Sequence, residues 1–195
     1  MKFQAMASAV VLFLVSAAAF AQDSKAPQGA PNSKGEQASP GPSSQGPFSS
    51  YNKIFYARMK TILVSSAEKM PEENYNFRPA ARVRTFGQIL GHIAQEQYLY
   101  FCAPVKGEQK SVDIERTKTT KPDLLAALKE SFAYCDAVYN QMADAEATSV
   151  VNSGGSKSTK LRLLWMNVVH DESHYGNLVT YLRIKGIVPP STEGQ

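Results

Sequence analysis

The chain has 195 residues, 43% of them hydrophobic, and a formal net charge of +4, which allows one domain with a substantial core. Its basic residues are scattered, and the only dense basic stretch holds Arg78, Arg82 and Arg84. Because no repeated basic-aromatic pattern follows this stretch, the composition argues against a nucleic-acid-binding class.

Residues 1–21 have the pattern of a signal peptide. Lys2 precedes an apolar run from about Ala5 to Phe20, and Ala19-Phe20-Ala21 forms a small-x-small cleavage signal. The alternative is an uncleaved anchor, but the run is short for a membrane span, which needs roughly 20 apolar residues. We therefore predict cleavage after residue 21, export to the periplasm or the medium, and no stable membrane insertion of the mature chain.

Residues 22–47 are predicted to be a disordered linker. This segment holds five Pro, four Gly and five Ser in 26 residues, and it has no aromatic residue. Such a composition cannot bury enough apolar surface to offset the entropy lost on ordering. The folded domain is then expected at residues 48–190, followed by a tail at 191–195.

Two helices are predicted in the first half of the domain. The first opens at Ser49-Ser50 and carries apolar residues at three- and four-residue spacing until Pro71 ends it. The second opens at Thr85, with Gln88 at the offset of a capping box, and stops at Ala103-Pro104.

Two further helices are predicted in the second half. One opens at Thr120, with Pro122 in its first turn, and its apolar stripe extends to Met142. The other opens near Ser158-Thr159 and continues to about Lys185, before a glycine cap and two prolines. No strand is expected, although Val150-Val151 is locally ambiguous.

Four amphipathic helices of this length predict an all-α four-helix bundle. The connection from Pro104 to Thr119 is long enough for the second and third helices to run parallel. In that case Cys102 and Cys135 lie at similar heights and could form a disulfide in an oxidising compartment. The alternative is two buried thiols that pack as small apolar residues.

All three histidines of the chain fit one metal site. His170 and His174 lie four residues apart on one helix face, and His92 lies on the second predicted helix. Three imidazoles with an open position are the ligand set of catalytic zinc and of related divalent metals. A chance pair of histidines is the alternative. The protease motif H-E-x-x-H is absent because Asp171 replaces its glutamate.

Glu96 is the candidate catalytic residue, because it lies one turn beyond His92 on the same face. It could orient the imidazole, join the metal ligands or act as a general base; the alternative is a solvated glutamate. Asn167 and Tyr181 share the face of the histidine pair, as ligand contacts or as hydrogen-bonded core residues.

The order of these motifs resembles the DinB-like (DinB/YfiT-like) superfamily. The last-helix stretch His170-Asp171-Glu172-Ser173-His174-Tyr175-Gly176-Asn177-Leu178 is similar to the family signature, and it ends in Leu182-Arg183, Gly186 and Pro189-Pro190. The segment from Thr85 to Ile93, preceded by Arg78-Pro79, resembles the family's second helix. The resemblance covers residues 51–190.

The resemblance implies an up-down-down-up bundle with a long crossover between helices 2 and 3. It also implies that His92, His170 and His174 bind a divalent metal, zinc or nickel first and iron or manganese next. Some relatives use low-molecular-weight thiols, and homodimers are frequent among them. The function expected is an exported metal-dependent hydrolase or thiol transferase with an unknown small-molecule substrate. The alternative is a non-enzymatic metal-binding or structural bundle.

Overall fold

The computed structural model describes residues 45–194, and this part of the chain is mostly helical. Its long helices are α1 (Pro47–Lys69), α2 (Phe86–Glu96), α5 (Lys121–Gln141) and α6 (Lys160–Ile184). The shorter elements are η1 (Glu72–Asn74), η2 (Gln97–Phe101), α3 (Cys102–Val105), α4 (Ile114–Thr117), η3 (Asp144–Glu146), β1 (Val150–Ser153), β2 (Ser156–Thr159) and η4 (Pro190–Thr192). None of the described helices is both long enough and apolar enough to cross a membrane.

The expected signal peptide and residues 22–44 of the expected linker lie outside the described residues. The last three linker residues, 45–47, are described. Pro47 is the first residue of α1, one position before the predicted domain start.

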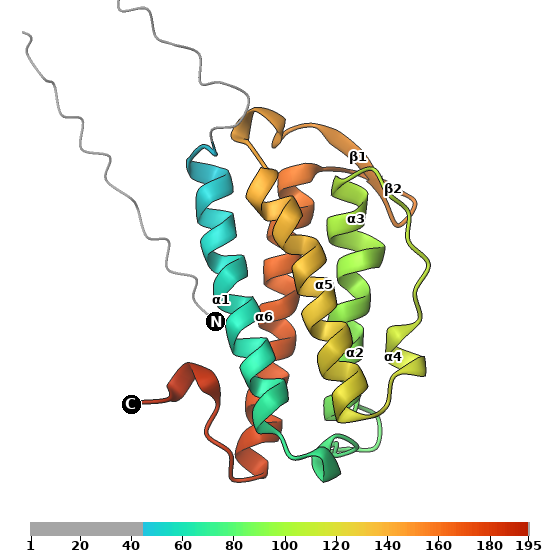
Figure 1. Ribbon diagram of the computed structural model, residues 1–195, viewed down its shortest axis with the longest axis vertical. Helices are drawn as coiled ribbons and strands as arrows, with labels where there is room; N and C mark the ends of the chain where they lie inside the picture. The colour runs from blue at the N-terminus through green and yellow to red at the C-terminus, as the bar shows by residue number, and fades with distance from the viewer. Residues whose placement is uncertain (1–44, 195) are drawn as a thin grey trace, which may run out of the picture. The chain divides into compact units, whose positions relative to one another are not determined.

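The long helical segments lie side by side (Figure 1). The Nζ atom of Lys121, at the start of α5, donates to the carbonyl oxygen of Met70 at the end of α1, at 2.7 Å. The hydroxyl of Tyr181, near the end of α6, donates to the carbonyl oxygen of Arg84 just before α2, at 2.8 Å. Therefore α5 runs antiparallel to α1, and α6 runs antiparallel to α2.

One apolar core lies between these helices. Its largest fully buried side chains come from all four long helices and their connections: Tyr75, Tyr139, Phe86, Phe132, Leu63, Met70, Leu90, Ile93, Leu124, Leu128, Leu164 and Leu178. Full burial of one such side chain contributes about 1.5–3 kcal/mol before entropic costs. This packing fixes α2 and α6 as neighbours.

The helix starts predicted from capping residues are confirmed. The Thr85 hydroxyl accepts from the Gln88 backbone N–H at 3.1 Å, and the Gln88 side chain accepts from the Thr85 N–H at 2.9 Å. The hydroxyls of Thr120 and Thr159 each accept from the backbone N–H three residues on, at the starts of α5 and α6. In contrast, α1 begins at Pro47, before the predicted start at Ser49-Ser50. At the end of α6, Gly186 adopts a φ of +72°, which favours glycine at this position.

The predicted end of the second helix was wrong. The helical backbone continues beyond α2 through the π-helical segment η2 and through α3 to Val105. Pro104 has no N–H, so the carbonyl oxygen of Tyr100, four residues earlier, has no helical donor. That oxygen accepts instead from the Ser153 hydroxyl of β1 at 2.6 Å. An outside donor therefore lets the helix continue through proline.

The expectation of no strands was also wrong. β1 and β2 form an antiparallel hairpin in which Val150 pairs with Thr159 and Ser153 pairs with Ser156. The turn residues Gly154 and Gly155 have φ of +57° and +80°, as tight hairpin turns require. The helical core agrees with the all-α prediction, and the hairpin is an addition at its edge.

Cys102 and Cys135 form a disulfide with a Cα–Cα separation of 5.5 Å. The predicted proximity of these residues is confirmed, and the alternative of two free thiols is excluded. The bond joins α3 to α5, across a sequence separation of 33 residues. A disulfide that closes such a loop typically stabilises a fold by about 2–4 kcal/mol.

Candidate metal centre

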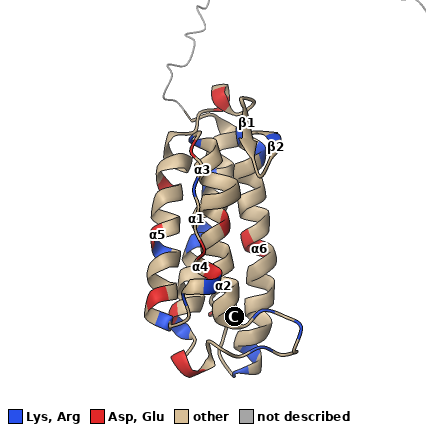
Figure 2. Cartoon of the chain, turned by 90° about the vertical axis from the view of Figure 1, so that its right-hand side faces the viewer, with Lys and Arg blue, Asp and Glu red and all other residues tan. Residues whose placement is uncertain are grey.

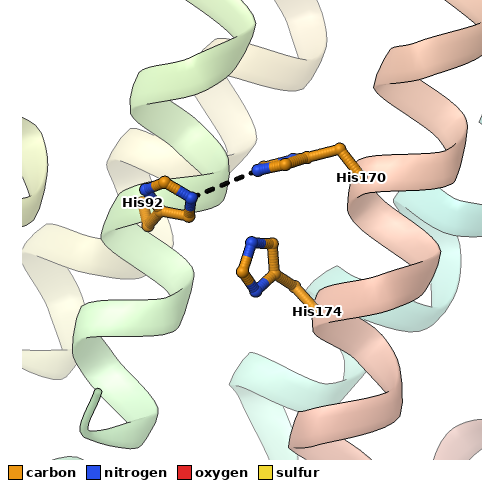
Figure 3. A group of neighbouring side chains, drawn as sticks. All are labelled: His92, His170 and His174. Atoms are coloured by element: carbon orange, nitrogen blue, oxygen red, sulfur yellow. Dashed lines mark hydrogen bonds between the residues drawn. The ribbon is translucent and has the colours of Figure 1, made fainter. Parts of the chain in front are cut away.

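Helices α2 and α6 bring the three histidines together. His92 extends from α2 toward His170 and His174 of α6 (Figure 3). The Nε2 atoms of His92 and His170 are 3.2 Å apart. One nitrogen from each ring belongs to a set in which all atoms lie within 4.8 Å of one another. This is the juxtaposition that the sequence pattern predicted.

A glycine shapes the surroundings of His92. A side chain at Gly91 would place its Cβ 3.0 Å from the Cα atom of Glu115 in α4. Glycine therefore lets α4 approach α2 closely. The approach brings the Glu115 carboxylate beside His92.

The imidazoles are held in their neutral form. Burial, with the nearby Arg84 guanidinium, lowers the pKa of His170 to about 4. Burial and the neighbouring His170, His92 and Arg84 lower the pKa of His174 to about 4, although Glu115 opposes this shift. Burial, Arg84 and His170 also lower the pKa of His92. Neutral imidazole is the form that ligates a metal, so the cluster needs no deprotonation at neutral pH.

A carboxylate and a guanidinium orient His92. The Nδ1 atom of His92 lies 3.1 Å from Oε2 of Glu115, and Nε of Arg84 donates to Oε1 of Glu115 at 2.7 Å. A carboxylate on one imidazole nitrogen fixes which nitrogen remains free. Here Nδ1 is engaged and Nε2 faces the other two histidines. The sequence did not indicate Glu115, because its position in an irregular connection has no helical period that relates it to His92.

Glu96, the predicted catalytic residue, lies on the same side of His92 as Glu115. Its Oε1 atom is 3.8 Å from Nδ1 of His92, and its side chain is 16% exposed. Burial and the neighbouring Glu115 raise the pKa of Glu96, while Arg84 opposes the shift. Among the three roles considered from the sequence, this placement favours orientation of the imidazole. A role as general base stays a prediction.

Asp171 lies behind His170 and away from the cluster. It is fully buried, its Oδ1 atom is 3.6 Å from Nδ1 of His170, and burial raises the pKa of its carboxyl group.

The two polar residues noted beside the histidine pair make structural hydrogen bonds. The Asn167 side chain donates to the Tyr139 hydroxyl at 3.2 Å, and Tyr181 donates to the backbone of Arg84. Asn167 is fully buried. Of the two roles considered, these bonds favour that of hydrogen-bonded core residues.

The three histidines fit a divalent metal ion. Neutral imidazoles can share at most one hydrogen between the facing Nε2 atoms of His92 and His170. The Nδ1 atoms of His170 and His174 are buried without a hydrogen-bond partner among the described residues. Zinc binds imidazole nitrogen at about 2.0–2.1 Å, which separates two tetrahedral ligands by roughly 3.4 Å. The observed 3.2 Å between Nε2 atoms matches this separation.

The fold and the site define a class: a mostly helical protein with a three-histidine cluster between its second and last long helices. Residues 56–178 match the model of the DinB superfamily, which covers more than half of the chain. The protein belongs to the DinB superfamily.

Named relatives agree with this assignment. The chain is 25% identical over 123 residues to the uncharacterized protein YjoA of Bacillus subtilis (strain 168), a match that spans 62% of this chain and 79% of YjoA. A DinB-like crystal structure from Bacillus cereus ATCC 10987 superposes with a TM-score of 0.60 at 14% identity, over 71% of this chain and 93% of that one. The crystal structure of YjoA gives a TM-score of 0.56 at 20% identity, over 70% and 92% of the two chains. These structures share the fold.

Proposed function

We propose that the protein binds one divalent metal ion through His92, His170 and His174 and acts as a metal-dependent hydrolase or thiol transferase on a small molecule. The observation that carries this proposal is the cluster of three neutral, half-buried imidazoles whose nitrogens converge. Zinc and nickel are the first candidates, and iron or manganese also suit imidazole ligands.

An enzyme is favoured over a purely structural metal bundle by the number of ligands. Structural zinc sites are closed by four protein ligands, whereas catalytic sites keep an open position. Among the described residues the cluster contains three ligating side chains. His174 also lines a pocket, so a small molecule can approach the cluster from outside.

A bound divalent metal would lower the pKa of a water or thiol ligand and polarise an electrophile. The chain's own residues would prepare the site for this chemistry. Glu115 holds Nδ1 of His92, and Arg84 holds Glu115. Glu96 lies close enough to reinforce this orientation or to accept a proton during turnover.

We also propose that the mature protein is exported and that its helices form the expected up-down-down-up bundle with a long crossover. The disulfide supports export, because such bonds persist in oxidising compartments. The contacts at the ends of α1, α2, α5 and α6 support the connectivity.

Elemental analysis of protein from its native compartment tests metal binding, with purification that avoids a nickel resin. Wild-type protein should contain about one divalent ion per chain, and His170→Ala should contain far less. Glu172→Gln is the matched control, because Glu172 is exposed on the same helix and should leave the metal content unchanged. Full metal retention by His170→Ala would rule out the proposed ligand set.

A further inference from the structure

A pocket of about 780 Å³ lies beside the three-histidine cluster. Its wall includes His174 and Glu115 from the centre, together with Arg78, Arg82 and Arg84 from the connection before α2. Pockets for small molecules are usually about 300–1,000 Å³. The size therefore suits a small ligand that extends from the arginines to the histidine cluster.

The charged lining of this pocket is strongly unbalanced. Three arginines and one glutamate give a formal charge of +2, since three positive charges face one negative charge. Figure 2 shows acidic and basic residues interspersed over the helices in that view.

The three arginines have different surroundings. Arg84 is held by Glu115, which in turn contacts His92. Arg78 and Arg82 are exposed and form no ion pair within residues 45–194. A guanidinium matches the geometry of carboxylate and phosphate groups, which accept two parallel N–H bonds. These two side chains are thus free to bind an anion.

Uncharged polar groups complete the wall between the two ends of the pocket. Asn177 and Thr180, both exposed on α6, follow His174 along the pocket side of that helix. Their amide and hydroxyl groups can donate to oxygen atoms of a ligand. The lining thus combines cationic, neutral polar and imidazole groups.

We propose that Arg78 and Arg82 bind the carboxylate or phosphate group of a small anionic substrate whose opposite end reaches His174. The identification of this ligand as a substrate rests on the proposed metal-dependent function. The arginines then set specificity and position, while the histidine centre contacts the reacting end.

The test compares small aromatic probes that differ in charge: benzoate, phenyl phosphate and the uncharged benzyl alcohol. Binding to full-length protein is followed by NMR titration, both after dialysis against a chelator and after loading with zinc. The chelated sample removes direct coordination of a probe by metal. The variants are Arg78→Gln with Arg82→Gln, and Arg58→Gln as the matched control, because Arg58 is an exposed arginine on α1 outside the pocket.

We expect each anion to bind wild-type protein and Arg58→Gln with the same affinity. Benzyl alcohol should bind neither protein. The double variant should bind the anions about tenfold more weakly, because charge-assisted hydrogen bonds are lost. Tighter binding of phenyl phosphate would assign a phosphate ligand, and tighter binding of benzoate would assign a carboxylate.

Two results would overturn the proposal: no anion binding by wild-type protein, or equal anion affinity in the double variant. Metal content, measured separately, distinguishes this failure from that of the proposed function. If the protein binds metal but its anion affinity does not depend on the arginines, the proposed metal centre stands and the proposed anion site is refuted. Arginine-dependent affinity without stoichiometric metal keeps the anion site and refutes the metal-dependent function.

Discussion

At the scale of single residues, Glu115, which lies outside the histidine motif, orients the candidate metal ligand His92. The Glu115 carboxylate lies 3.1 Å from Nδ1, and the Nε2 atom faces His170. Metal-ligating histidines are usually oriented by such a partner, and its loss costs about 10–100-fold in metal affinity or activity. Glu115 therefore has a larger expected role in metal retention than its position in a surface connection suggests.

Replacement of Glu115 by glutamine tests this role. Glu115→Gln keeps the shape but removes the charge that holds His92 and Arg84, so zinc affinity should fall about 10–100-fold. Competition with a chromophoric chelator measures the affinity. Glu96→Gln provides the comparison, because its carboxylate lies farther from Nδ1, at 3.8 Å.

Glu96→Gln should retain zinc with little change in affinity. If Glu96 is the general base, its variant should lose about 10²–10⁴-fold in turnover once a substrate is known. If zinc affinity fell in Glu96→Gln and stayed unchanged in Glu115→Gln, Glu96 rather than Glu115 would be the residue that orients His92. Unchanged turnover in Glu96→Gln would show that Glu96 has no catalytic role.

At the scale of elements, α1 depends for its N-terminal cap on Asp144, the first residue of η3. No side chain from the start of the helix caps it. Instead, Asp144 accepts hydrogen bonds from the backbone N–H groups of Phe48 and Ser49 at 3.1 and 2.7 Å. A Cβ atom on Gly46 would collide with the Asp144 carboxylate, so a larger residue there would displace the capping side chain. The cap thus couples the start of α1 to η3.

This cap predicts a pH-dependent contribution to stability. Partial desolvation would raise the pKa of Asp144, but hydrogen bonds from Ser49 and Phe48 hold it below its usual 3.8. A lowered pKa in the folded state stabilises the protein above the unfolded-state pKa, and the benefit disappears as pH falls through the folded-state pKa. Asp144→Asn should therefore melt a few degrees below wild-type protein at pH 7, and the gap should begin to narrow below about pH 4, as the pH falls toward the lowered folded-state pKa.

Thermal melts from pH 3 to pH 7 measure this effect. Glu130→Gln is the control, because Glu130 is an exposed acid on α5 without an ion pair among residues 45–194. Its melting temperature should follow wild-type protein at every pH. A constant difference between Asp144→Asn and wild-type protein over this range would contradict the electrostatic cap.

The elements that the sequence predicted are those with local signals. Thr85, Thr120 and Thr159 were identified as helix starts because capping depends on residues three positions apart. The continuation through Pro104 was missed, because it depends on the distant Ser153 hydroxyl. The hairpin was missed because β1 is short and mostly exposed, which leaves little alternation of apolar and polar residues.

The residues of the candidate site also fall into two groups: those related by a local sequence pattern and those brought together by tertiary contacts. His170 and His174 are linked by one helical turn, and the helical pattern of the second segment placed His92 on an inward face. Glu115 reaches His92 only because α4 packs closely on Gly91, a tertiary contact without sequence periodicity. The three-histidine cluster was therefore predictable from local pattern, whereas the side chains beside it were not.

At the scale of the whole molecule, the described contacts bear on where the folded domain begins. Composition predicts that residues 22–47 contribute nothing to the core. However, the Gln45 side chain donates to the carbonyl oxygens of Tyr139 and Asn140 at 2.6 and 3.0 Å, near the end of α5. The carbonyl oxygen of Gly46 accepts from the Ser50 N–H at 3.0 Å. These bonds show that the folded domain includes Gln45 and Gly46, before the predicted start at residue 48.

Two truncated proteins test this boundary against the mature chain, which is expected to start at Gln22. A protein that starts at Gln45 should keep the same melting temperature, because residues 22–44 have a composition that cannot build a core. A protein that starts at Phe48 loses the Gln45 and Gly46 bonds and places a new ammonium group at the positive end of the α1 dipole. At about 1 kcal/mol for each of these three bonds, and roughly 2–4 °C per kcal/mol for a domain of this size, we expect a loss of about 6–12 °C. Equal melting temperatures for the two truncated proteins would return the domain boundary to Phe48. A melting temperature of the Gln45 protein below that of the mature chain would show that residues before Gln45 pack on the domain.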